Sequence, residues 1–536
     1  MSRAQRLSTL PGQVVCPATD FNRRPRESHR QVRVFAASLN AARIDYLRFC
    51  TSGFDSQEFG MTFRALQWLP VIWMGLGLTS TAASADDLPP SLFVEGYADK
   101  ISYAPGEEVA LHVSTSAPRF ALTVSRVGAE VKEVLAKADI PGVLSPVPEN
   151  ASSHGCRWPA AFRFKIPEDW TSGYYAIRFS ASDGGGKWVA RGRRTAESQA
   201  FLIVRPAQPG TKSRILLQLS TNTYNAYNNW GGSSLYAYHG RANLQGHRVS
   251  FLRPPASQFE NWERPFVAWA EKNGYAIDFC ANGDLEFHPE LLAAYKLVLS
   301  VGHDEYWSSL MRDHLEAFIG KGGNVAFFSG NTCCWQVRSE DDGTALTSWK
   351  QSPNSDPLYP EPDKKLLSTL WSHYLIGRPE NQLTGVGFLW GGYHKSHGQF
   401  MDGKGAFRVH QPDHWLFAGT NLRRDDEFGA KHSIVGYECD GCELDWKDGL
   451  PVPTHRDGTP ETFQVLATCP AKWHPDDCEW YEKWERGRVG NAVLGVYTRG
   501  GTVFTCGSTD WAHGLRGGDE VTERITRNIL DRLGTP

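Results

Sequence analysis

Three short segments of this 536-residue sequence combine glycine with side chains that can transfer protons or bind a polar ligand. They read STNTYNAYNNWGG at 220–232, GHDEYWS at 302–308 and GNTCCWQVRSE at 330–340. Histidine and carboxylate groups act as general acids and bases, while a few well-placed polar and aromatic side chains orient a ligand. The candidate substrate-binding residues in these segments are Tyr227, Asn228, Trp230, Asn331 and Trp335.

Each segment directly follows an apolar run that is typical of a buried strand, at 215–219, 296–301 and 324–329. Further strands are expected at 247–252, 275–279 and 502–505, and helices at 265–273, 307–319 and 521–533. Such alternation of apolar strands with helices indicates a parallel sheet covered on both faces. Because ligands bind at the carboxyl ends of strands in an open α/β sheet, we expect the three segments to converge on one rim.

The preceding part of the chain has a different pattern. Residues 108–113, 119–127 and 174–179 alternate apolar and polar side chains, and turn sequences rich in Gly, Pro and Asp separate them. Short strands with this alternation indicate an immunoglobulin-like β-sandwich. A Pro- and Gly-containing linker, RPAQPG, follows at 205–210. The sequence therefore predicts an all-β domain over 86–207 and an α/β domain over 208–536.

Residues 61–85 have the pattern of a secretory signal peptide. Arg64 gives a positive start, residues 65–78 are almost wholly apolar, and Ala83-Ser84-Ala85 forms an A-x-A cleavage site. A buried core helix is the alternative interpretation of this run. The signal predicts that Met61 is the true start, that 1–60 is a disordered upstream extension, and that the mature protein is periplasmic or secreted. No other run is long enough to span a membrane.

Composition excludes several classes of protein. The formal net charge is −3 without a long basic run, so nucleic-acid binding is not expected, because phosphate binding needs a positive field. The sequence has no G-x-S-x-G, Walker A or H-E-x-x-H motif, which removes the signals for serine hydrolases, P-loop nucleotide binding and zincins. Aromatic residues make up 12%, a content that suits sugar-binding surfaces and large aromatic cores alike.

Four cysteines cluster near the C-terminus, at Cys439, Cys442, Cys469 and Cys478. In a cytosolic protein this spacing would suggest zinc. In an oxidising compartment two disulfides are favoured, although the sequence does not fix their pairing.

The same turns carry a family resemblance. Residues 221–236, 297–308, 322–340, 434–441 and 501–515 resemble, in this order, the C-terminal domain of the large (beta) subunit of N,N-dimethylformamidase. The resemblance covers roughly 210–536 and implies a flavodoxin-like, class I glutamine-amidotransferase-like α/β fold. It also implies hydrolysis of a small amide to formate and an amine, with a mononuclear iron held by two tyrosines and one glutamate. The family's small subunit is not part of this chain.

The resemblance assigns some of these roles to particular residues. Tyr306 matches one iron-binding tyrosine, Glu340 is the best match for the carboxylate ligand, and Glu438 matches a second functional acid. The second tyrosine is missing at Pro265-Phe266, where it is sought. Phenolate and carboxylate are hard oxygen ligands that suit Fe(III), which would polarise an amide carbonyl. The candidates for proton transfer are Glu438, His303 and His513.

Structural roles are the alternative for these residues. Tyr306 could be a buried core tyrosine, and Glu340 stands beside Asp341-Asp342-Gly343, a sequence typical of a solvated turn. Asp304 and Glu305 could cap the helix expected from residue 307.

The sequence thus predicts an exported, metal-assisted hydrolase of an amide bond in a small substrate, compatible with a homo-oligomer. The alternative is a non-catalytic secreted carbohydrate- or peptide-binding protein that kept the fold and lost the metal. The missing second tyrosine favours the alternative, whereas the motifs at 303–307 and 331–340 favour the enzyme.

The signal peptide gives the first testable prediction. Expressed from Met61 in a host with a secretion system, the protein should be exported and begin at Asp86, because cleavage follows the A-x-A site. N-terminal sequencing of the exported protein checks this. Finding any part of residues 1–60 on the mature chain would contradict both the start site and the signal.

Overall fold

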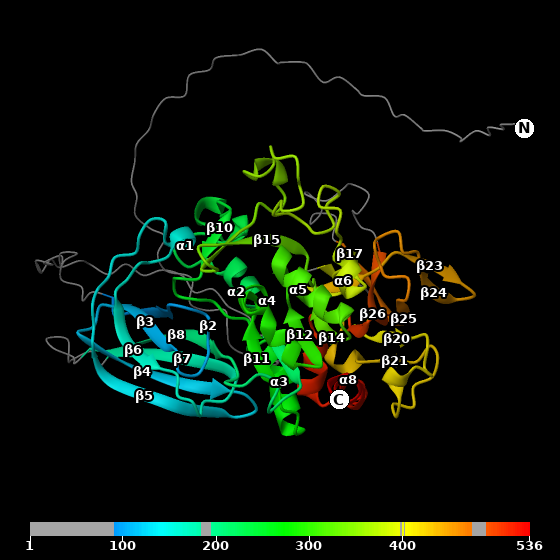
Figure 1. Cartoon of the computed structure of the whole chain (residues 1–536), viewed down its shortest axis with the longest axis horizontal. Coiled ribbons are helices and arrows are strands. Elements are labelled where there is room, and N and C mark those ends of the chain that lie inside the picture. The colour runs from blue at the N-terminus through cyan, green and yellow to red at the C-terminus, as the bar shows by residue number, and fades with distance from the viewer. Residues whose placement is uncertain (1–90, 184–193, 397–398, 401–402, 474–488, 536) are drawn as a thin grey trace, which may run out of the picture. The chain divides into compact units, whose positions relative to one another are not determined.

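A computed structural model describes residues 91–183, 194–396, 399–400, 403–473 and 489–535 (Figure 1). These residues belong to one compact unit of mixed α/β architecture in which strands predominate. The predicted upstream extension and signal peptide lie outside the described residues. Within the described part, no helix combines the length and apolar character that crossing a bilayer requires.

Residues 94–204 form two sheets around a shared apolar core. In β4, Phe120, Leu122 and Val124 are buried and alternate with more exposed neighbours, which confirms the predicted alternation. Leu111 of the other sheet and Leu202 belong to the same core. The smaller sheet has the order β1 (Val94–Ala98), β3 (Glu108–Thr115), β6 (Ala160–Lys165). The larger has the order β2 (Ser102–Tyr103), β8 (Thr195–Val204), β7 (Gly173–Ser182), β4 (Arg119–Val127), β5 (Val131–Pro141).

A nine-stranded sheet forms the centre of the rest of the chain. Five adjacent strands are parallel, in the order β11 (Asp278–Ala281), β9 (Ile215–Leu219), β12 (Leu297–His303), β14 (Asn324–Gly330), β27 (Gly501–Thr505). The antiparallel strands β26 (Val489–Arg499), β25 (Gln464–Lys472), β20 (Phe407–Val409) and β21 (Glu427–Phe428) continue it. The predicted parallel strands are therefore present, near their expected positions.

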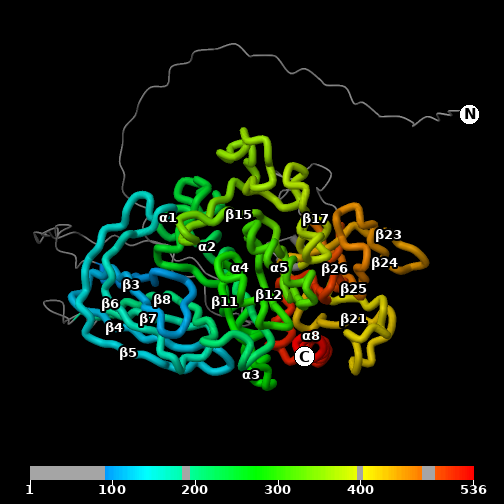
Figure 2. The backbone as a smooth tube through the Cα atoms, viewed as in Figure 1, coloured from blue at the N-terminus to red at the C-terminus, as the bar shows by residue number. Residues whose placement is uncertain are grey.

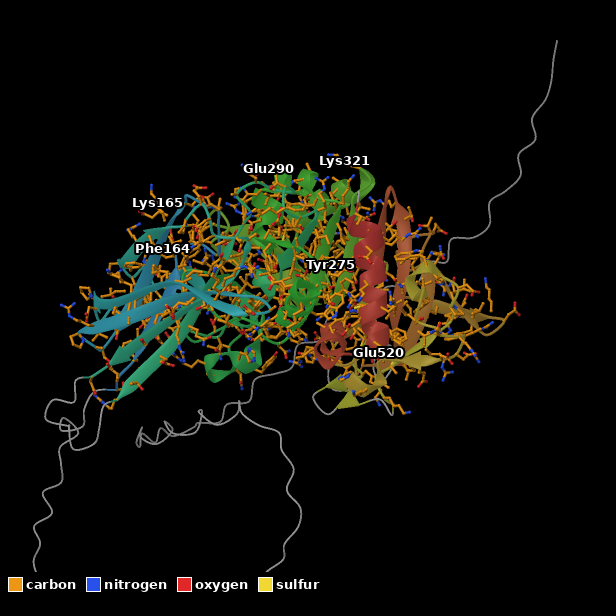
Figure 3. All side chains as sticks on the ribbon, turned by 90° about the horizontal axis from the view of Figure 1, so that it is seen from below. Phe164, Lys165, Tyr275, Glu290, Lys321 and Glu520 are labelled. Atoms are coloured by element: carbon orange, nitrogen blue, oxygen red, sulfur yellow. The ribbon has the colours of Figure 1, made fainter. Side chains whose placement is uncertain are left out.

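Both faces of this sheet are covered, as the apolar strands predict. Leu217 packs into a core with helices α3 (Glu263–Lys272), α7 (Trp511–Gly517) and α8 (Glu520–Gly534), whereas its neighbour Leu216 packs into the core that contains α5 (Ser309–Gly320). Successive strand residues point to opposite faces, so one strand serves both cores. Figure 3 shows Tyr275 beside α8, where its hydroxyl donates to Asp531 at 2.8 Å.

The strand expected at 247–252 belongs to a different sheet. Residues Arg248–Ser250 (β10) pair antiparallel with β16 (Ala345–Thr347), in a small sheet completed by β15 (Trp335–Glu340) and β13 (Tyr306–Ser308). β13 begins shortly after β12 ends, so this sheet stands at the carboxyl end of the parallel strands (Figure 2). The expected helix start at 307 also shifts, because Ser308 is the cap of α5 and accepts a hydrogen bond from the Met311 amide.

The two parts of the compact unit are joined by buried polar contacts. Arg205, in the predicted linker, pairs with Asp284 at 3.1 Å, and Ser102 donates to the same carboxylate at 2.7 Å. Trp230 also lies at this junction, where its indole N–H donates to Glu95 at 3.2 Å. The remaining α-helices and strands of the described residues are short: α1 (Ala151–His154), α2 (Thr221–Tyr227), α4 (Asn282–Phe287), α6 (Asn381–Thr384), β17 (Gly387–Gly392), β18 (Lys395–Ser396), β19 (Gln399–Phe400), β22 (Cys439–Gly441), β23 (Leu444–Lys447) and β24 (Leu450–Pro453).

The prediction of two disulfides among the clustered cysteines is wrong. Cys439 and Cys442 both carry free thiols, and two disulfides would need all four cysteines. Cys439 and Cys442 cannot bridge each other, because Cys439 packs into the core that contains α8 and Cys442 into the core that contains α5. Cys478 lies outside the described residues.

The burial of these two thiols predicts their reactivity. Cys439 and Cys442 are 0% and 3% exposed, so an alkylating reagent should leave them unmodified in the native protein. In denaturant without a reductant, both should become modified, as located by peptide mass spectrometry. Recovery of either residue in a cross-linked peptide would contradict the assignment of free thiols.

Candidate functional site

The turn after β12 is fixed by a buried acid that sequence patterns leave ambiguous. Asp304 accepts a hydrogen bond from Ser300 at 2.7 Å and further bonds from Gln218 and Asn282. Gly302 has φ of +82°, and a side chain there would collide with Trp262. Asp304 thus anchors the turn rather than capping a helix, and its two neighbours His303 and Glu305 are free to face a common site.

His303 and two carboxylates form the centre of this site. The His303 Nε2 atom lies 2.8 Å from Glu438 Oε2 and 3.3 Å from Glu305 Oε2, and all three side chains are buried. Burial would lower the pKa of His303, but the two carboxylates outweigh it and raise that pKa to about 10. Burial raises the pKa of Glu438. For Glu305 the effect of burial is outweighed by His303, so its pKa is lowered.

Opposite pKa shifts give the two carboxylates different chemistry. Glu305 is held as an anion, whereas Glu438 takes up a proton more readily. Pairs of titratable groups whose pKa values are pushed apart are typical of acid–base sites. The geometry therefore provides one fixed negative charge and one proton acceptor, with His303 between them.

Two tyrosines complete an oxygen cluster around Glu305. The Tyr236 Oη atom lies 2.9 Å from both carboxylate oxygens of Glu305 and 2.7 Å from Tyr227 Oη. Trp335 donates its indole N–H to the same carboxylate at 2.7 Å. The Thr223 hydroxyl accepts a hydrogen bond from the Glu305 amide at 2.9 Å. Two phenol oxygens and one carboxylate thus follow one another in a hydrogen-bonded series centred on Tyr236. Hard oxygen donors of this kind suit a hard trivalent ion such as Fe(III).

A buried lysine faces this cluster. Lys350 donates to Tyr306 Oη at 2.6 Å, and its Nζ atom lies 3.3 Å from the centre of the Tyr236 ring. The segment that follows β16 positions it, because the Lys350 amide donates to Ser368 O and the Thr369 hydroxyl donates to Lys350 O. Burial lowers the pKa of Lys350 to about 7. The site therefore contains an amine that titrates near neutrality.

These groups open into a cavity of about 560 Å³. Its lining consists of Tyr227, Leu235, Tyr236, Ala237, Tyr238, Gln245, Glu305, Asn331, Cys334, Trp335, Lys350, Gln351, Phe388, Tyr393, Tyr437 and Glu438. The three segments singled out in the sequence all reach it, which confirms their convergence at the carboxyl ends of the strands.

The structure brings together some of the predicted site residues. Tyr227, Asn331, Trp335 and Glu438 line the cavity. His303 contacts Glu438, and Tyr306 contacts Lys350, which also lines it.

Other predicted residues lie elsewhere. Asn228 is buried and donates to Pro254 O at 2.9 Å, and Trp230 lies at the junction with the first two sheets. His513 lies on α7, where its ring nitrogen is 3.2 Å from Asn261 O. None of these side chains is among the described residues that line the cavity.

Glu340 and Tyr306 do not share a site. Tyr306 is opposite Trp335 in the parallel β13–β15 pair, so Glu340 lies five residues further along β15. At about 3.3 Å per residue this is a separation of roughly 16 Å. Glu340 accepts instead from Arg248 at 2.8 Å. The two residues that the sequence motifs suggest as ligands are therefore too far apart to bind one ion.

Sequence patterns missed three important residues. Glu305 resembles a helix cap by its position, yet its carboxylate is the centre of the oxygen cluster. Tyr236 is the last residue of the 221–236 motif, and its place in that motif was the one sequence signal that could have identified it. Lys350 stands outside every motif, and only the fold brings it to the cavity.

The family model described as "N,N-dimethylformamidase beta subunit-like, C-terminal" matches residues 121–524. The chain belongs to this family. The match includes every residue of the oxygen cluster. It also includes most of β4 and all of β5 to β8, which precede the region of resemblance seen in the sequence.

Two relatives of this dimethylformamidase beta subunit-like chain are both named N,N-dimethylformamidase beta subunit. The protein from Alcaligenes sp is 25% identical and that from Paracoccus aminophilus is 24% identical. Each alignment covers 70% of this chain and 54% of the relative. The chain thus spans about half the length of these relatives. A ThuA-like protein of known structure from Parabacteroides merdae matches 60% of this chain and 91% of its own, at 10% identity and a TM-score of 0.22.

The hydrogen bonds of Asp440 predict that this residue stabilises the turn after β14. Its two carboxylate oxygens accept the amides of Asn331 at 2.9 Å and Thr332 at 3.0 Å, where Asn331 has a positive φ of 50°. The Asp440→Asn substitution replaces one carboxylate oxygen with an NH2 group, which cannot accept a hydrogen bond from the amide that faces it. We expect a loss of about 1–3 kcal/mol in the free energy of unfolding, the cost of an unsatisfied buried donor.

Denaturant unfolding checks this value, with Asp445→Asn as the matched control. Asp445 is exposed, so its substitution should change stability by less than about 0.5 kcal/mol. Equal stability of the two variants would show that Asp440 does not hold the turn.

Proposed function

We propose that this protein hydrolyses the carbon–nitrogen bond of an amide. The observation that carries the proposal is the position of the Tyr236 hydroxyl, 2.7 Å from Tyr227 Oη and 2.9 Å from the Glu305 carboxylate, beside the His303–Glu438 pair. Family membership supports it, because the two relatives are named as subunits of an amide-hydrolysing enzyme.

Tyr227, Tyr236 and Glu305 are the residues that would hold Fe(III). They supply the two tyrosines and the glutamate that the sequence resemblance implies, from positions other than those the motifs suggested. When bound, such an ion supplies Lewis-acid polarisation of the amide carbonyl. The lowered pKa of Glu305 supports this role, since an anionic ligand favours a cation.

The proton transfers are assigned to His303 and Glu438. Water adds through its oxygen to the amide carbon, and Glu438, the proton acceptor of the pair, removes a proton from that water. The carbon–nitrogen bond then breaks, and the same proton passes to the leaving nitrogen, so that the products are a carboxylic acid and an amine. His303, 2.8 Å from Glu438, stabilises the Glu438 carboxylate before the first transfer and after the second. Asn331, at the cavity floor, is positioned to orient the substrate.

We further propose that residues 86–207 are an immunoglobulin-like domain and residues 208–536 a flavodoxin-like domain. Counted along the chain, the parallel strands have the order 2-1-3-4-5, which is that of flavodoxin-like sheets. Export through the signal at 61–85 is part of the same proposal, supported by the sequence pattern alone.

The metal prediction assigns different roles to Tyr236 and Tyr306. Protein produced with iron should absorb visible light, because tyrosinate-to-iron charge transfer lies in that range. Tyr236→Phe should bleach the colour and release the metal at a stability cost of about 1 kcal/mol for the lost hydroxyl. Tyr306→Phe is the matched control. Tyr236 is partly buried and Tyr306 fully buried, but the Tyr306 hydroxyl faces Lys350, so this variant should stay coloured.

Activity is measured as formate and amine released from N,N-dimethylformamide. Glu438→Gln should keep the colour and lose about 10²–10⁴-fold in kcat, the usual contribution of a general acid–base group. A colourless, metal-free and inactive parent would overturn the proposal and support the non-catalytic carbohydrate- or peptide-binding alternative.

A further inference from the structure

The cavity is larger than the simplest substrate requires. Its volume of about 560 Å³ falls within the range of roughly 300–1,000 Å³ that is typical of sites for drug-sized ligands. N,N-dimethylformamide has no more non-hydrogen atoms than a glutamine side chain, so it would leave most of this space to water. The cavity therefore has room for a substituent on the amide.

The position of the reacting groups shows where this substituent would lie. Glu305, Glu438 and Asn331 are 3%, 3% and 1% exposed, so they form the floor of the cavity. Tyr238, which is 66% exposed, and the exposed Gln351 lie at its mouth. An amide held at the floor would extend the rest of its structure past the walls towards Tyr238.

The walls between floor and mouth are aromatic. Phe388, Tyr393 and Tyr437 form one continuous set of rings, with centres 5.4 Å and 6.2 Å apart in edge-to-face contact. The Phe388 ring is supported from behind by Trp473, at 4.5 Å. Ring faces and edges of this kind favour another aromatic group by stacking and by burial of its apolar surface.

The charges in the cavity disfavour an anionic substrate. Lys350 is the one basic side chain among the described residues of the lining, and it already contacts the Tyr306 hydroxyl and the Tyr236 ring. Glu305 and Glu438 stand at the floor. A carboxylate on the substrate would lie near Glu305 and Glu438, and no arginine is among the described lining residues to pair with it. The guanidinium group of arginine is the side-chain group that binds carboxylates best.

We propose that the substrate is a neutral amide that carries an aromatic substituent, which stacks on the Phe388–Tyr393–Tyr437 wall. This inference rests on the proposed function. To the proposed function it adds the class of amide that this chain would hydrolyse, which the names of the relatives do not give.

A comparison of amides tests the inference. N-benzylformamide carries the ring on the amine side and phenylacetamide on the acyl side, while N,N-dimethylformamide and acetamide are the small counterparts. At least one aromatic amide should exceed its small counterpart about tenfold in kcat/KM and in affinity measured by calorimetry. Even one extra methylene in an apolar pocket changes kcat/KM by roughly 10–200-fold.

Substitutions of two exposed tyrosines, one at the mouth of the cavity and one outside it, give a matched comparison. Tyr238→Ala removes an exposed ring of the cavity and should lower the ratio of aromatic to small amide at least about threefold. Tyr374→Ala removes a ring that is 80% exposed and outside the cavity lining, and it should leave the ratio unchanged. Because both rings are largely exposed, neither substitution should unfold the protein.

The outcomes separate this inference from the proposed function. Tight binding of the aromatic amide without hydrolysis would refute the hydrolase and support the aromatic wall as a binding site. Hydrolysis of small and aromatic amides at equal kcat/KM and equal affinity would keep the hydrolase and overturn the inference. A preference for N-formylphenylalanine, the anionic counterpart, would also overturn it.

Discussion

The carboxylate of Glu305 is the constraint on which the rest of the site depends. It is 3% exposed, and removing an ionised group from water costs several kcal/mol unless neighbouring groups compensate. The compensation comes from Tyr236, Trp335 and His303, which face its two oxygens. These partners come from three separate segments of the chain, so the anion exists only when the tertiary structure has assembled around it.

The central sheet provides that assembly. β12 and β14 are parallel neighbours with His303 opposite Gly330, so the turns that follow them are adjacent. Asp440 joins a third segment to this edge by accepting two amides of the turn after β14. Asp440 is buried and both of its carboxylate oxygens accept hydrogen bonds, which makes this edge rigid. Rigid support is what a site needs to hold reacting groups at fixed distances.

The segment between β16 and β25 decides what kind of molecule can reach the site. It supplies Lys350, Phe388, Tyr393 and Tyr437 and also the acid Glu438, whereas the turn after β12 supplies Glu305. The aromatic walls thus come from this segment, while the chemistry at the floor comes from both parts of the chain. Binding and catalytic residues commonly lie on loops that a rigid sheet positions.

The sequence by itself determined the parallel strands, both covered faces and the rim on which the three turns meet. These features follow from local periodicity, because a buried strand is apolar wherever it lies. Spacing along the chain could not identify the oxygen cluster. Tyr236 and Glu305 are far apart in sequence, and Tyr306, next to Glu305, faces Lys350 instead. Which neighbour points into the cavity depends on side-chain direction after the strand ends, and that is decided only by tertiary packing.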